Sequence, residues 1–237
     1  MNPILAAIGD GVITGVWVLC ASMFGFLASS VASALEVQHH YWANVGIITC
    51  IIFSFVFVFG FIGQAFGGAG FNPTATAAFY VAGVGDASLF SMALRFPAQA
   101  VGAVIGASAI TFLIPPEIKV GGPTLKVDLH TGAIAEGVLT FGITFAVLFI
   151  ILKGPQNAFL QAWMLAVVTI IFVLAGEPYT GPSMNPANAF GWAYVNQTHN
   201  NWDHFYVYWI TPFVGAIIAA AMFRVFFPPP KPKEKKA

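Results

Sequence analysis

Long stretches without charged residues dominate the pattern of the chain. Asp, Glu, Lys and Arg are absent from seven such stretches, the longest of which covers residues 37–85. An apolar helix needs roughly 20 residues to cross the hydrocarbon core of a bilayer. The pattern therefore predicts six membrane-spanning helices, at residues 4–30, 43–64, 89–114, 131–152, 158–174 and 204–227.

Two further apolar segments, residues 71–82 and 184–194, are too short to cross a bilayer. At about 1.5 Å per residue, each covers only about half of the hydrocarbon core. A surface loop is one alternative, and a helix lying on the membrane is another, although the polar faces of the segments are weak for such a helix. Irregular backbone is tolerated at membrane depth only where protein surrounds it, so we expect two re-entrant half-helices.

The composition changes this picture only by excluding other classes of protein. Charged residues make up 8% of the 237 residues and hydrophobic residues 58%, whereas soluble domains carry roughly a quarter charged residues. A basic surface for nucleic acid is excluded by the same shortage of Lys and Arg. Because lysines concentrate at the C-terminal end, the positive-inside rule places both termini in the cytosol. The chain is predicted to be an all-α integral membrane protein.

The sequence also repeats itself. The segment from Ile8 to Thr14 resembles the segment from Ile134 to Thr140, and each half contains one Asn-Pro motif. Three spans per half make the two copies enter the membrane in opposite senses, and such repeats place the functional site near the midplane. We therefore predict one domain at residues 1–230, built as an inverted 3+3 repeat. Repeat one covers residues 1–116 and repeat two covers residues 131–230. A cytosolic basic tail follows at residues 231–237.

The two Asn-Pro motifs open the two predicted half-helices, and they read Asn72-Pro73-Thr74 and Asn185-Pro186-Ala187. Asn is a favoured N-cap and Pro a favoured first helical residue. Opposed half-helices would point their positive dipole ends at the bilayer centre. Each Asn carbonyl can cap its own helix, which leaves amide N–H donors for a passing water molecule. Such a centre repels cations and interrupts a proton-conducting chain of water.

Asp10 and Glu136 occupy matched positions within the first and fourth spans. A carboxyl group inside a span is costly and is usually functional. We expect the two groups to brace the re-entrant loops by accepting hydrogen bonds from backbone N–H groups. A general acid/base pair is the alternative, but no nucleophile or metal cluster accompanies it, so an enzyme is the weakest interpretation. No cofactor or metal is expected.

At these residues the sequence resembles the aquaporin, or major intrinsic protein, family over nearly its whole length. The resemblance is carried by the acid-bearing spans and by the stretches around the two motifs, GAGFNPTAT from Gly68 and TGPSMNPANAFG from Thr180. It implies a homotetramer with one pore in each protomer. Thr74 in the first motif, and Gly70 where the family has His, look like the plant small basic intrinsic protein subfamily.

The resemblance also places a selectivity filter. The arginine that follows the second motif in the family is Asn188 here, and the family spacing puts the other filter positions at Ile52, Val173 and Pro182. The filter is therefore expected to be apolar and uncharged. Losing the arginine removes a charge and several donors, so exclusion of cations would depend more on the half-helix dipoles.

Together these features predict a passive channel for water, and for other small neutral solutes, in an intracellular membrane. Lys233 and Lys235 form a dilysine-type retrieval pattern for the endoplasmic reticulum, or else a positive-inside anchor. Asn196 begins a glycosylation sequon on the lumenal side, but its closeness to the second half-helix disfavours attachment. Two alternatives remain open. A non-conducting scaffold would keep the fold, and a secondary transporter would need an ionisable group that the half-spans lack.

Overall fold

The computed structural model describes residues 2–85, 87–115, 117–118 and 120–228, so Lys233, Lys235 and the predicted tail 231–237 lie outside it. Within these residues the six predicted spans are confirmed. The first span joins α1 (Pro3–Ala21) to α2 (Phe24–Ala34), and the others are α3 (Tyr41–Ala65), α5 (Leu89–Leu113), α6 (Leu129–Lys153), α7 (Ala158–Gly176) and a last span built from α9 (Trp202–Phe205), η1 (Tyr206–Ile210) and α10 (Thr211–Phe226).

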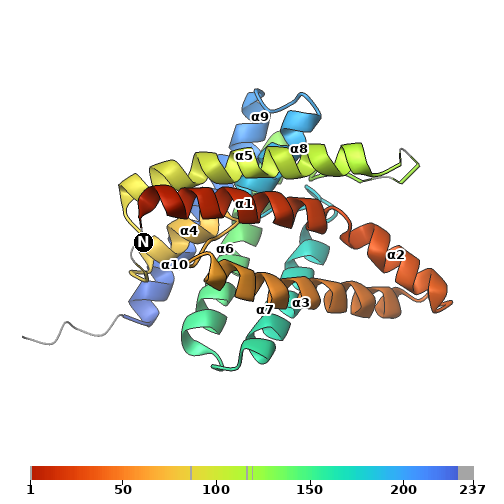
Figure 1. Cartoon of the computed structure of the whole chain (residues 1–237), viewed down its shortest axis with the longest axis horizontal. Helices are drawn as coiled ribbons and strands as arrows, with labels where there is room; N and C mark the ends of the chain where they lie inside the picture. Colours follow the sequence, from red (N-terminus) through yellow and green to blue (C-terminus); the bar gives the residue numbers. More distant parts are fainter. Residues whose placement is uncertain (1, 86, 116, 119, 229–237) are drawn as a thin grey trace, which may run out of the picture.

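Two spans are interrupted where the hydropathy pattern predicts continuous helices. The first breaks between α1 and α2, where the Ser22 hydroxyl donates to the Val18 carbonyl at 2.6 Å, a bond that often bends helices. Figure 1 shows α2 leaving the direction of α1. The last span widens to one π-helical turn just before Pro212, whose ring and missing N–H disfavour a regular α-turn there.

The two predicted half-helices are present as α4 (Pro73–Val81) and α8 (Pro186–Val195). With 9 and 10 residues, each is roughly 15 Å long, half the thickness of the hydrocarbon core. Each half-helix packs mainly against the third span of the opposite half, α4 on α10 and α8 on α5. This exchange holds the two halves together around the half-helices.

Glycines set the closest helix crossings. In the crossing of α1 and α5, which lie side by side in Figure 1, a Cβ atom on Gly102 would overlap the Gly11 carbonyl. In the crossing of α6 and α10, a Cβ atom on Gly215 would overlap the Gly137 carbonyl. Small residues let backbones approach in this way. The two contacts occupy matched positions in the two halves of the sequence.

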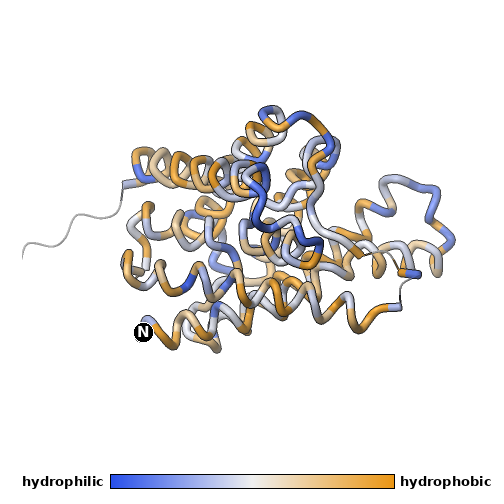
Figure 2. Tube along the Cα trace, turned by 90° about the horizontal axis from the view of Figure 1, so that it is seen from above, coloured by the Kyte–Doolittle hydropathy of each residue, from blue (hydrophilic) through white to orange (hydrophobic). Residues whose placement is uncertain are grey.

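The surface of the spans is apolar. Phe112, Ile105 and Val138 are 89%, 62% and 62% exposed, whereas many of the buried residues are alanines and threonines. Figure 2 shows hydrophobic positions along the helices and hydrophilic positions concentrated in the connecting segments. A contiguous apolar exterior of this kind fits lipid as the surrounding solvent.

Candidate functional site

Asn72 and Asn185 are the N-caps of the two half-helices, and both have extended backbone with φ of −142° and −148°. The Asn72 Oδ1 atom accepts the backbone N–H of Thr74 at 3.0 Å. The Asn185 Oδ1 atom accepts the backbone N–H of Ala187 at 3.1 Å and that of Asn188 at 3.4 Å. Each side-chain carbonyl is therefore occupied by its own helix, because the first N–H groups of a helix lack partners within it.

The two Asn side chains also cross-link the motifs. Asn72 Nδ2 donates to the Met184 carbonyl at 2.9 Å, and Asn185 Nδ2 donates to the Phe71 carbonyl at 2.8 Å. These reciprocal bonds bring the N-terminal ends of α4 and α8 together. An amide nitrogen carries two hydrogens, so one N–H from each Asn is used across the junction and the other has no acceptor among the described residues.

Thr74 and Met184 tighten the same junction. The Thr74 hydroxyl donates to Asn72 Oδ1 at 2.7 Å and lies 3.4 Å from the Met184 carbonyl oxygen. Met184 has a φ of 48°, a left-handed conformation that costs a non-glycine residue about 1–2 kcal/mol. Its carbonyl is held by Asn72 and its N–H by Glu136. The surrounding hydrogen bonds therefore fix a strained residue at the junction.

Glu136 of α6 is fully buried behind the second re-entrant loop. Its carboxylate accepts the backbone N–H of Ser183 at 2.8 Å, the backbone N–H of Met184 at 3.0 Å and the Thr180 hydroxyl at 3.0 Å. These are the contacts that a bracing carboxylate requires, since buried backbone N–H groups need acceptors.

Asp10 of α1 is equally buried but has a different set of donors. It accepts one backbone N–H from the first loop, that of Gly70 at 2.9 Å. Arg95 donates to it through Nε at 2.6 Å and Nη2 at 2.9 Å, and Gln99 donates through Nε2 at 2.6 Å. Sequence reasoning missed Arg95 and Gln99. A signal was available for Arg95, which is the one charged residue of α5, as Asp10 is of α1.

The residues expected in the filter fall into two groups. Ile52 of α3 and Val173 of α7 pack in one hydrophobic cluster between these helices. Pro182 packs against Gly176, the last residue of α7. Gly176 follows Val173 by three residues. Asn188 follows the second motif, and its Nδ2 atom donates to the Ser183 hydroxyl at 3.2 Å. The structure thus brings three of the positions to the C-terminal half of α7 and ties the fourth to the second loop.

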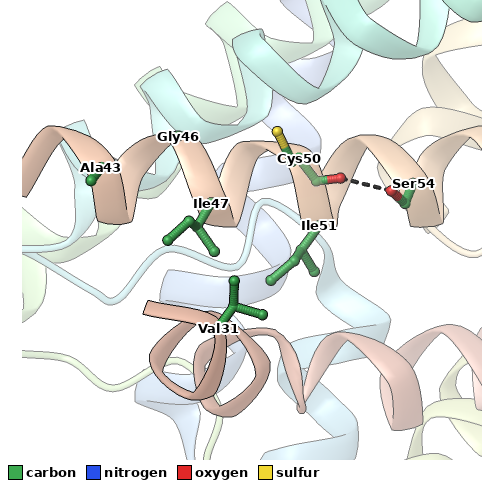
Figure 3. A pocket seen from close by; sticks show the side chains of 7 residues that line it. All are labelled: Val31, Ala43, Gly46, Ile47, Cys50, Ile51 and Ser54. Carbon is green, nitrogen blue, oxygen red and sulfur yellow. Dashed lines mark hydrogen bonds between the residues drawn. The ribbon is translucent and has the colours of Figure 1, made fainter. Parts of the chain in front are cut away.

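Two cavities lie on the surface of the spans. One, of about 440 Å³, lies between α2 and α3 and is lined by Val31, Ile47 and Ile51 (Figure 3). The nearby Ser54 hydroxyl donates to the Cys50 carbonyl, so the wall is apolar. The other, of about 740 Å³, is an apolar groove along α1 and α5. Both are open apolar surfaces, and neither touches the Asn-Pro motifs.

The predicted glycosylation site lies at the periphery of the fold. Asn196 directly follows α8 and is exposed. Among the residues that the structure describes, no group of three or more His, Cys, Asp or Glu side chains is arranged to hold a metal ion.

Comparison with known proteins gives one consistent result. The family described as "Major intrinsic protein" matches residues 16–223. Aquaporin SIP1-2 of Zea mays is 57% identical over 98% of this chain and 97% of its own length. Aquaporin SIP1-1 of Arabidopsis thaliana is 54% identical over 100% of this chain and 98% of its own. The aquaglyceroporin of Plasmodium falciparum has a TM-score of 0.70 at 16% identity, covering 96% of this chain and 98% of that one, and shares the fold.

Proposed function

Because the chain belongs to the major intrinsic protein family, we propose that it is a passive channel for water and other small neutral solutes in an intracellular membrane. The observation that carries this function is the crossed pair of hydrogen bonds from Asn72 to Met184 and from Asn185 to Phe71. The bonds hold two half-helix N-termini together, and each Asn keeps one N–H for the permeant.

The chemistry of this junction selects for neutral, hydrogen-bonding solutes. Each half-helix contributes a positive dipole end of roughly half an elementary charge, which repels cations. The free N–H groups of Asn72 and Asn185 hold a water molecule by its oxygen, so its hydrogens point away from the centre. A proton-conducting chain of water is interrupted there.

The size of the solute would be set by the filter positions. Ile52, Val173 and Pro182 offer apolar surface, and Asn188 offers an uncharged amide fixed by Ser183. We propose that these residues form the constriction. An apolar, uncharged constriction carries no charge to attract an ionic solute.

The assembly and location follow from the family resemblance and the C-terminal sequence. We propose a homotetramer in the membrane of the endoplasmic reticulum with both termini in the cytosol. Cross-linking and light scattering of the detergent-purified protein measure the subunit number. Replacing Lys233 and Lys235 with alanine in a fluorescent fusion is expected to move the protein to later membranes. Unchanged localisation would favour the positive-inside anchor.

Stopped-flow light scattering on proteoliposomes tests the channel. We expect water flux above that of empty vesicles with a low activation energy, and we expect Asn185→Asp to change it. Asn157→Asp is a matched control, since exposed Asn157 caps α7 in the same way, away from the motifs. Folded protein with flux no faster than bare lipid would refute the channel and favour a scaffold. Flux that requires an ion gradient would favour a secondary transporter.

A further inference from the structure

Arg95 presents the accessible end of a buried ion pair. Its Nε and Nη2 atoms hold the Asp10 carboxylate, whose side chain is 0% exposed, while the Arg95 side chain is 12% exposed. A guanidinium group has five N–H donors, and among the described residues Nη1 has no hydrogen-bond acceptor in the protein. The carboxylate is therefore enclosed, and the positive group carries the accessible surface of the pair.

The guanidinium lies against the loop that leads into the first motif. Gly70, two residues before Asn72, donates its N–H to the same carboxylate. A Cβ atom on Gly70 would lie 3.8 Å from Arg95 Nη2 and 3.6 Å from the Thr76 hydroxyl. A methyl group would fit, but a larger side chain would meet the guanidinium. Arg95 thus occupies the space beside the loop, where the absence of a side chain at position 70 makes room for it.

The accessible part of Arg95 is expected to face water. Charged side chains within a span face the protein interior or a water-filled cavity, because exposure to lipid is too costly. The other described lysines and arginines lie near helix ends or, for Lys126, in the segment between α5 and α6. Lys126 pairs with exposed Glu177, Lys153 lies over the Phe227 ring, and Arg224 donates to the Val81 carbonyl at the end of α4. Among the lysines and arginines that the structure describes, Arg95 is therefore the one that lies next to an Asn-Pro motif.

We propose that Arg95 is a specificity-determining residue of the channel. Its guanidinium, held in place by Asp10, is a fixed positive charge beside the first motif that excludes cations and protons. In this proposal Arg95 supplies the positive charge that is missing after the second motif, where Asn188 is uncharged. The inference rests on the proposed channel function, because it assigns selectivity to the path through the two motifs.

The test is the ratio of proton permeability to water permeability in proteoliposomes. A pH-sensitive dye inside the vesicles reports proton flux at a set potential, and light scattering reports water flux. The double variant Asp10→Asn with Arg95→Gln removes both charges and keeps polar side chains in the cluster. We expect its ratio to rise on the order of tenfold, because the variant removes an ion pair whose positive end is the accessible one and therefore acts most strongly on a cation in the path. Arg95→Lys keeps the charge, and its ratio should stay near wild type.

Two further variants separate charge from structure. Arg224→Gln is the matched control, because it makes the same change at an arginine away from the motifs, and its ratio should equal that of wild type. Asp10→Asn alone leaves the guanidinium without its counter-charge, so the ratio should fall below wild type. This opposite sign tests the proposal even if the double variant does not fold.

Three outcomes would overturn the proposal. One is a folded double variant with the wild-type ratio. Another is a parallel loss of both fluxes with an unchanged ratio, which indicates a purely structural role. In the third, wild-type protein conducts no water above empty vesicles, which refutes the channel itself and the role of Arg95 with it. The first two leave the channel function standing, so the two failures are distinguishable.

Discussion

Replacing Glu136 with glutamine tests whether this carboxylate braces the second loop. The Oε1 atom accepts from Ser183 and Thr180, and the Oε2 atom accepts from Met184. Glutamine keeps one side-chain oxygen as an acceptor for the donors on one side of the carboxylate. On the other side its NH₂ group, which is itself a donor, would face the N–H that the second carboxylate oxygen now accepts. One buried N–H then loses its partner, which costs about 1–3 kcal/mol. Because Met184 is strained, with a φ of 48°, we expect the loop to be the first part to loosen.

Thermal unfolding of the detergent-purified protein measures this cost. For a chain of this size, a loss of 1–3 kcal/mol corresponds to a fall in melting temperature of roughly 2–12 °C. Water flux should fall as well, because Met184 carries the carbonyl that positions Asn72. Glu177→Gln is the control. Glu177 pairs with Lys126 at the surface, where an ion pair contributes about 0–1 kcal/mol. If Glu136→Gln melts and conducts like the control, the bracing role is wrong.

Three more predictions concern helix packing, pH and modification. Gly102→Ala should prevent stable folding, because its Cβ atom would overlap a carbonyl of α1, whereas Gly46→Ala, which meets nothing within 4 Å, should purify normally by gel filtration. Hydrogen bonds from Thr131 lower the pKa of Asp128, the exposed N-cap of α6, below its ordinary 3.8. Its contribution is therefore present above pH 3.8 and is lost as the pH falls through the lowered pKa, so Asp128→Ala should melt below wild type at neutral pH and the gap should close in acid. Asn196 should stay unglycosylated, so endoglycosidase treatment and Asn196→Gln should leave the gel mobility unchanged.

The sequence predicts the spans because their signal is local. Uncharged stretches and Asn-Pro pairs are short-range features, so the six spans and the short helices α4 and α8 could be located without coordinates. The break at Ser22 and the π-helical turn before Pro212 were missed, because hydropathy averages over a helical turn and does not report its geometry. The Asp10–Arg95 contact joins residues 85 positions apart. Only the packing of α1 on α5 brings them together, so the sequence shows each as the one charged residue of its helix but does not show that the two helices are neighbours.

The two halves meet the same structural need with different chemistry. Glu136 reaches two backbone N–H groups of its loop and is satisfied by neutral donors. Asp10 is one methylene shorter and accepts one N–H from its loop, so Arg95 and Gln99 of α5 supply the rest. A shorter carboxylate thus brings a guanidinium group to the first motif, whereas the carboxylate at the second motif has only neutral donors. The two halves of the inverted repeat therefore differ in charge beside their motifs, and the proposed selectivity role of Arg95 depends on this difference.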